Sequence, residues 1–199
     1  MSRTRGSGGR SRWLLAPLLW LAATSVLAGP APPEEYLDED TAATITVVGE
    51  PLVFANERRD LAANARDYVT VAAAAVNRAG KVTYVVIAYF WSTVDPRLRP
   101  DPLLSPGVLS LQADDRRIDL HLDGHSAHEA GIGRPVHEPP GSPVTPNVYR
   151  TDLPTLRFLS EARHLKLVAD NEATVVEFDL WEDRRTALRA FVRHMSGDD

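Results

Sequence analysis

Cysteine is absent from all 199 residues of the chain. Disulfide bridges, thiol nucleophiles and a lipid anchor on an N-terminal cysteine are therefore excluded, whichever compartment holds the protein. Long apolar stretches are missing as well. The longest runs from Trp13 to Leu27 and contains Pro17, which is shorter than the roughly 20 residues a membrane-spanning helix needs.

Several catalytic signatures are also missing. Ser126 lacks the Gly-x-Ser-x-Gly elbow of serine hydrolases. His125 and His128 are one residue too close, and have no glutamate between them, for the HExxH metalloprotease motif. No glycine-rich loop joins a strand to a helix, so nucleotide binding has no support. The sequence therefore favours a protein that is not an enzyme.

Residues 1–28 show the three-part pattern of a secretory signal peptide. Four arginines and no acid precede the apolar stretch, which ends in Val26-Leu27-Ala28. We expect cleavage near Ala28 and a periplasmic or secreted protein with no stable membrane anchor after cleavage. The alternative, an uncleaved membrane anchor, is disfavoured by the short apolar run.

The net charge restricts the partners. The whole chain carries −5, and removing the four arginines of residues 1–28 takes the remaining 171 residues to −9. Nucleic acid and anionic membranes attract clustered Lys and Arg, so an acidic chain disfavours both as main partners. A periplasmic or envelope protein is the expected partner, and the oligomeric state stays open.

The composition divides the remainder into a leader and a domain. Residues 29–42 combine proline, glycine and five acids, which predicts a flexible, solvated leader. Residues 43–199 then form a single domain. Its clearest element is a long hairpin with strands over 67–77 and 81–93, and the second strand is apolar enough for burial on both faces. A second hairpin is expected over 108–113 and 116–122, where Ile118, Leu120 and Leu122 alternate with polar residues.

The C-terminal third predicts two helices and two strands. A short helix over 152–162 is capped by Thr151 or Asp152, and strands follow over 164–169 and 173–181. An amphipathic helix from Arg184 to Met195 begins after Asp183, which we expect to cap it. The predicted fold class is α+β: mainly antiparallel sheet built of hairpins, with one short helix and a C-terminal amphipathic helix packed on the sheet.

Histidines cluster in one irregular stretch. Four of the six fall within 17 residues, interleaved with carboxylates: His121, His125, His128 and His137. Imidazole is the commonest metal-binding side chain, and with carboxylates it suits zinc or copper. One interpretation of residues 124–147 is thus a metal-binding loop, and the other is a solvated polar loop in which histidine is incidental.

Aromatic residues crowd the second strand of the long hairpin. Tyr84, Tyr89, Phe90 and Trp91 lie there, and Trp181 ends another predicted strand. Core packing is one interpretation, and an exposed aromatic row that binds a sugar or a peptide is the other.

The outline resembles small exported proteins of unknown function from Gram-negative bacteria. The resemblance lies in the signal peptide, the long apolar hairpin ending in Tyr89–Thr93 and the closing strand and helix over Glu177–Met195. It implies location and broad architecture. The leading functional hypothesis is a non-catalytic accessory or binding domain for a protein partner. The alternative is a periplasmic metal-binding protein using the stretch from His121 to His137.

Overall fold

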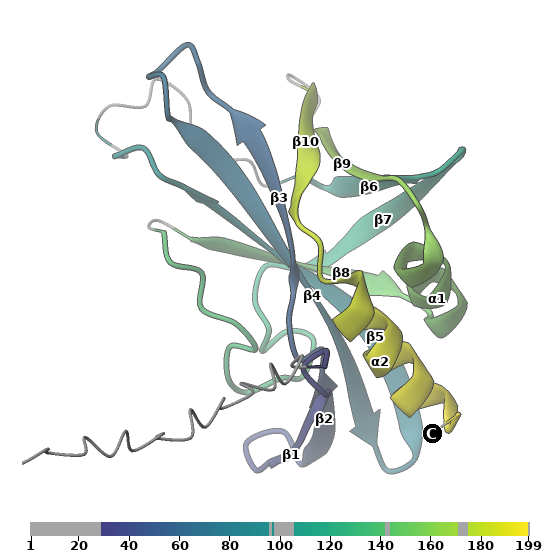
Figure 1. The fold of residues 1–199 in the computed structure, drawn as a ribbon. Helices are drawn as coiled ribbons and strands as arrows, with labels where there is room; N and C mark the ends of the chain where they lie inside the picture. Colours follow the sequence, from purple (N-terminus) through teal and green to yellow (C-terminus); the bar gives the residue numbers. More distant parts are fainter. Residues whose placement is uncertain (1–28, 96, 98–105, 142–143, 171–174, 199) are drawn as a thin grey trace, which may run out of the picture.

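The computed structural model describes residues 29–95, 97, 106–141, 144–170 and 175–198. The signal-peptide prediction lies outside these residues. Ten strands and two short helices form in the described chain (Figure 1). The strands are β1 (Glu34–Asp38), β2 (Ala43–Val47), β3 (Leu52–Glu57), β4 (Arg66–Arg78), β5 (Lys81–Ser92), β6 (Val108–Ala113), β7 (Arg116–Gly124), β8 (Thr145–Thr151), β9 (Leu165–Asp170) and β10 (Val175–Glu182). The helices are α1 (Leu153–Glu161) and α2 (Arg185–Ser196).

Eight of the strands close into an antiparallel barrel. Their order around the barrel is β4-β3-β10-β9-β6-β7-β8-β5, and β5 pairs back with β4. The mainly antiparallel architecture predicted from the sequence is confirmed, and the structure adds the closure. Closure leaves no free edge among these eight strands.

The β4–β5 hairpin forms as predicted, within one residue at each end. The turn at Ala79 and Gly80 adopts positive φ at both positions, 51° and 85°. Residues 85–92 are all buried, because the barrel interior covers one face and other parts of the chain cover the other. The sequence does not predict strand β8, because Pro146 and the polar residues around it are typical of a loop. The strand pairs with both β5 and β7.

The N-terminal leader is a correction to the sequence prediction. In place of a flexible segment over 29–42, residues 34–38 form β1, which pairs with β2. The acids stay mostly at the surface while Tyr36 lies partly buried, with the Arg134 guanidinium 3.8 Å from its ring centroid. The Asp38 carboxylate accepts hydrogen bonds from the backbone N–H groups of Asp40 and Gly133. The acidic stretch therefore forms an edge hairpin in which most charges face water and Asp38 is buried, and the sheet begins at Glu34 rather than Ala43.

The barrel interior is filled by side chains. Phe54, Phe90 and Phe178 are at most 1% exposed, and so are Leu109 and Leu111 of β6 and Leu167 of β9. The gap left where Leu188 of α2 approaches Val71 and Leu111 is about 20 Å³. That volume has room for about one water molecule. The interior around this gap is thus a packed core.

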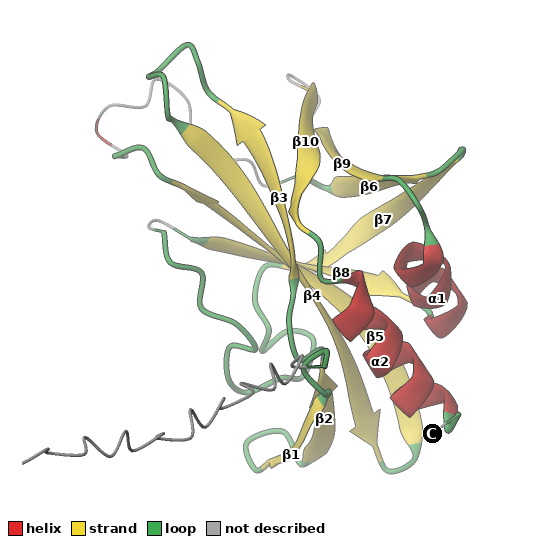
Figure 2. Ribbon diagram, in the orientation of Figure 1, coloured by secondary structure: helices red, strands yellow, loops and turns green. Residues whose placement is uncertain are grey.

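Both helices lie on the same side of the barrel and contact each other (Figure 2). Asp152 caps α1, as predicted, by accepting a hydrogen bond from Thr155 N at 2.8 Å. The predicted cap of α2 is displaced by one position. Arg184 is the N-cap, while Asp183 accepts from Arg185 N at 3.1 Å. Helix α2 ends at Gly197, whose φ of 69° suits glycine, and its Phe191 and Val192 join the core.

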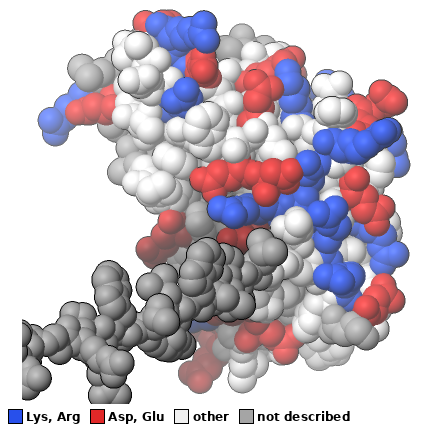
Figure 3. Space-filling view, viewed as in Figure 1, with Lys and Arg blue, Asp and Glu red and all other residues white. Residues whose placement is uncertain are grey.

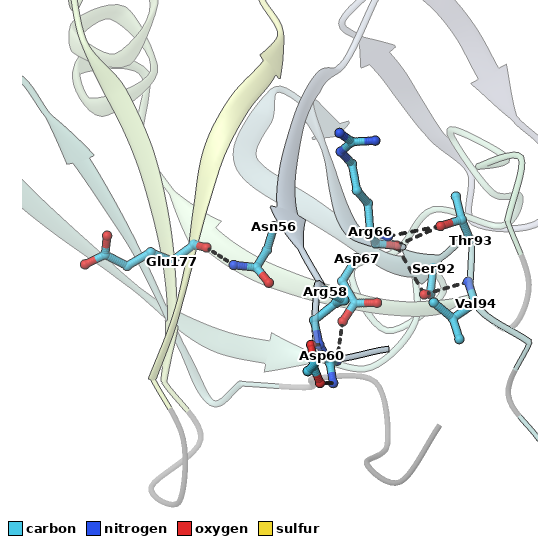
Figure 4. A network of polar contacts seen from close by, with 9 residues as sticks. All are labelled: Asn56, Arg58, Asp60, Arg66, Asp67, Ser92, Thr93, Val94 and Glu177. Carbon is cyan, nitrogen blue, oxygen red and sulfur yellow. Dashed lines mark hydrogen bonds and ion pairs between the residues drawn. The ribbon is translucent and has the colours of Figure 1, made fainter. Parts of the chain in front are cut away.

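A polar network holds the connection between β3 and β4 (Figure 4). Arg58 donates to Asp60 and, at 2.9 Å, to Asp67. The Arg66 carbonyl accepts hydrogen bonds from the backbone N–H and the hydroxyl of Thr93. These contacts join the ends of three strand segments, so we assign this cluster a structural role.

Candidate functional site

A groove with an aromatic lining crosses the outer face of strands β3, β4, β5 and β10. Its volume is about 420 Å³, and we call it the aromatic groove. The lining residues are Glu50, Pro51, Val53, Tyr68, Thr70, Trp91, His137, Pro140, Trp181, Glu182 and Arg184. Neighbouring strand residues with the opposite parity, such as Val69 and Phe90, face the barrel core.

Trp181 is the most conspicuous side chain of this groove. It is 53% exposed, which is unusual for so large an apolar surface. The β10–β3 register shows why: Leu180 pairs with Phe54 and Glu182 pairs with Val53, so Trp181 is an extra residue in a bulge. Bulges redirect side chains and are frequent beside functional sites. The indole is held at the surface by the backbone.

Two further aromatic rings are fixed beside Trp181. Tyr68 stacks on Trp91 with ring centroids 4.2 Å apart and planes 11° apart. The Trp91 indole N–H donates to the Thr70 hydroxyl at 2.9 Å, which sets the orientation of the pair. Tyr68 meets Trp181 edge to face, at 6.3 Å and 78°. The rings thus form a corner with two nearly perpendicular surfaces.

Charged groups flank this aromatic corner. The Arg66 guanidinium carbon lies 4.8 Å from the Trp181 ring centroid. Arg184 is paired with Glu50 at 3.7 Å and with Glu182 at 3.4 Å. Acidic and basic side chains are interspersed over the face that carries β3, β10 and α2 (Figure 3). The groove therefore offers apolar surface in its middle and both signs of charge beside it.

One wall of the groove comes from the predicted irregular stretch. His137 packs edge to face on Tyr89, with ring centroids 6.0 Å apart. Burial lowers the pKa of His137 below its ordinary value, while the nearby Glu138 carboxylate acts in the opposite direction. Burial also raises the pKa of Tyr89 to about 12. Both rings are thus neutral near pH 7 and serve as packing surface.

Gly141 continues this wall. A Cβ built there would overlap the Trp91 ring and would lie 3.0 Å from the Ser92 carbonyl oxygen. Only glycine fits against the indole at this distance. The stretch after His137 is therefore seated closely on the strand beneath it.

The structure does not bring the four predicted metal ligands together. His121 is exposed on β7, His128 is exposed on the following segment, and His137 lies in the groove wall. His125 Nδ1 lies 3.2 Å from Asn147 Oδ1. The described residues contain no group of three or more His, Cys, Asp or Glu side chains placed to hold a metal ion. The zinc or copper site stays a prediction from spacing.

The glutamate between these histidines closes the local turn. Glu129 accepts hydrogen bonds from the His125 backbone N–H at 3.1 Å and from the Ser126 hydroxyl at 3.0 Å. Ser126 is thus bonded within its own turn. The Glu129 carboxylate thus stabilises the turn that the chain makes after β7.

Sequence reasoning found the aromatic residues without resolving their roles. The structure separates them by strand face: Phe90 fills the barrel, Trp91 lines the groove, and Tyr89 lies under the 137–141 segment. One signal was available. Val176, Phe178 and Leu180 alternate regularly, and Trp181 breaks that alternation.

Comparisons with known proteins give no match: none with protein-family models, none with curated proteins and none with solved structures. Among the described residues, neither helix has the length and apolarity required to cross a membrane.

Proposed function

We propose that this protein is an exported, non-catalytic binding domain that holds an extended segment of a protein partner in the aromatic groove. The observation that carries the proposal is Trp181, 53% exposed in a strand bulge and set at right angles to Tyr68. Exposed, rigidly held tryptophan and tyrosine dominate the energetics of protein recognition sites.

The polar groups of the groove favour binding over catalysis. Glu50 and Glu182 both pair with Arg184, so neither carboxylate is set up as a base. Thr70 is 1% exposed, and its hydroxyl accepts the hydrogen bond from the Trp91 indole N–H. Among the described lining residues, no nucleophile stands beside a base that would activate it.

The shape and polarity favour a polypeptide. An open groove with an aromatic corner suits an extended, proline-containing segment, which loses little entropy on docking. The chain's own Pro140 and Gly141 already pack against this aromatic surface. Arg184, Glu50 and Glu182 lie beside the apolar corner, where we expect them to contact polar groups of the partner.

Fluorescence polarisation with labelled decapeptides of varied proline and charge content tests the proposal. We expect a proline-containing subset to bind, and Trp181→Ala to weaken binding about tenfold or more, because a central aromatic anchor is removed. Leu37→Ala is the matched control, since Leu37 is also exposed, at 68%, but lies on β1 away from the groove lining.

Two outcomes would contradict it. Equal binding by Trp181→Ala and the unaltered protein would show that the aromatic groove does not bind the peptide. Binding of chitin or glucan oligosaccharides in place of all the peptides, with loss in Trp181→Ala, would make the groove a sugar site.

A further inference from the structure

A second groove, separate from the aromatic groove, lies between helices α1 and α2. Its volume is about 540 Å³. Arg157 of α1 faces Arg189 and Arg193 of α2 across it, and we call it the arginine groove. Ser160 and Val192 also line it and are almost fully buried, at 1% and 4% exposed. The groove therefore has a closed floor and cationic sides.

Two of its three arginines have a guanidinium group with no hydrogen bond or ion pair in the described part of the chain. Arg157 Nη2 donates to Ser196 Oγ at 2.7 Å and lies 3.5 Å from the Asp198 carboxylate, so its guanidinium is held in place. The Arg193 guanidinium makes no hydrogen bond or ion pair with any described residue. The Arg189 guanidinium makes none either, although its charge helps to lower the pKa of Asp183. They are one helical turn apart and so share a face of α2.

The charge of the groove differs in sign from that of the chain. Three guanidinium groups line it against two carboxylates, those of Glu161 and Asp198. The whole chain carries −5. A cleft with a local positive potential concentrates anions even on an acidic protein. An excess of basic groups over acidic ones, with two guanidinium groups that make no ion pair among the described residues, points to an anionic ligand.

The groove is also built on rigid elements. Asp152 caps α1, and α2 ends in the αL residue Gly197, whose N–H bonds back to the helix. The Ser196 hydroxyl that orients Arg157 is itself held by the Val192 carbonyl at 2.8 Å. Helix-borne side chains lose less freedom on binding than loop-borne ones.

We propose that the arginine groove binds a phosphate group, carried either by a small phosphorylated molecule or by a lipid headgroup. The guanidinium fork matches two phosphate oxygens, and charge-assisted bonds of this kind are the strong ones. Glu161 and Asp198 disfavour long polyanions, because their carboxylates would repel the additional charge. A single phosphate held by Arg189 and Arg193, with Arg157 beside them, balances the excess positive charge of the groove.

Two measurements at low ionic strength test this site and distinguish the sources of phosphate. The first is calorimetric titration of the protein with inorganic phosphate and with pyrophosphate. The second is co-sedimentation with phosphatidylglycerol vesicles and with phosphatidylcholine vesicles. Each is run on the unaltered protein, on R189Q/R193Q and on R59Q/R117Q. The last variant removes the same charge from two exposed arginines elsewhere, 82% and 58% exposed.

We expect R189Q/R193Q to bind about tenfold or more weakly, because charge-assisted hydrogen bonds are lost, while R59Q/R117Q binds as the unaltered protein does. Loss in the titrations alone identifies a small phosphorylated ligand, and loss in the vesicle assay alone identifies a lipid headgroup. Either result supports the site. Equal weakening in the two variants would reduce the effect to overall charge and overturn the proposal, as would no binding in either assay. The two grooves share no lining residue, so we expect peptide binding in the aromatic groove to be the same in R189Q/R193Q, and the two proposals can fail independently.

Discussion

The inner and outer faces of β3, β4, β5 and β10 both carry aromatic residues, but they differ in how far those residues are exposed to solvent. Phe54, Phe90 and Phe178 point inward and are at most 1% exposed, whereas Trp181 points outward and is 53% exposed. Because side chains alternate along a strand, adjacent residues such as Tyr68 and Val69 belong to different faces. The inner rings stabilise the barrel, and we infer that the outer rings are available to a partner.

The largest expected effect comes from the inner face. Phe178→Ala should lower the free energy of unfolding by about 3–5 kcal/mol, since a packed interior cannot close the resulting cavity. Trp181→Ala, which removes a larger but exposed side chain, should cost less than about 1.5 kcal/mol, the value of its aromatic contact. Urea unfolding followed by circular dichroism measures both. Similar losses for the two variants would show that the outer ring is structural as well.

The next effect concerns the wall of the groove. Gly141→Ala should destabilise the protein by about 1–3 kcal/mol, because the new methyl group overlaps the Trp91 ring and must displace it or the segment that carries it. Peptide binding should fall as well, since the displaced wall alters the groove. Gly107→Ala is the matched control, because a Cβ there meets no atom within 4 Å. Equal behaviour of the two variants would show that the wall yields easily.

Local sequence patterns are sufficient to predict the elements whose contacts lie within a short stretch of chain. The β4–β5 hairpin needs only two apolar runs and the turn at Ala79 and Gly80, and it forms where predicted. The α1 cap at Asp152 and the alternation around Phe178 are equally local. Each of these depends on contacts or periodicities within a short stretch of chain, which the sequence displays directly.

Barrel closure and the aromatic groove depend on distant registers. Strand β8 is recognisable only through its pairing with β5 and β7, because Pro146 makes it resemble a loop. The bulge at Trp181 exists only relative to β3, so the sequence shows a break in alternation but not its direction. Closeness in sequence does not fix surroundings in space either. His125 lies beside Asn147 and His137 packs on Tyr89, which the spacing of the histidines does not show.

The smallest effect expected is the pH dependence of the groove wall. Burial lowers the pKa of His137 below its ordinary value of 6.5, so the unfolded chain takes up a proton at a higher pH than the folded protein does. The contribution of neutral His137 to the free energy of unfolding is therefore complete above about pH 6.5. It is lost as the pH falls from there toward the pKa of the folded state. We expect the unaltered protein to lose more stability between pH 7 and pH 5 than His137→Asn does, as measured by urea midpoints. His128→Asn, at an exposed position, should lose as much as the unaltered protein. An unchanged pH dependence in His137→Asn would mean that the imidazole is solvated in both states, and the wall would then be looser than its contact with Tyr89 indicates.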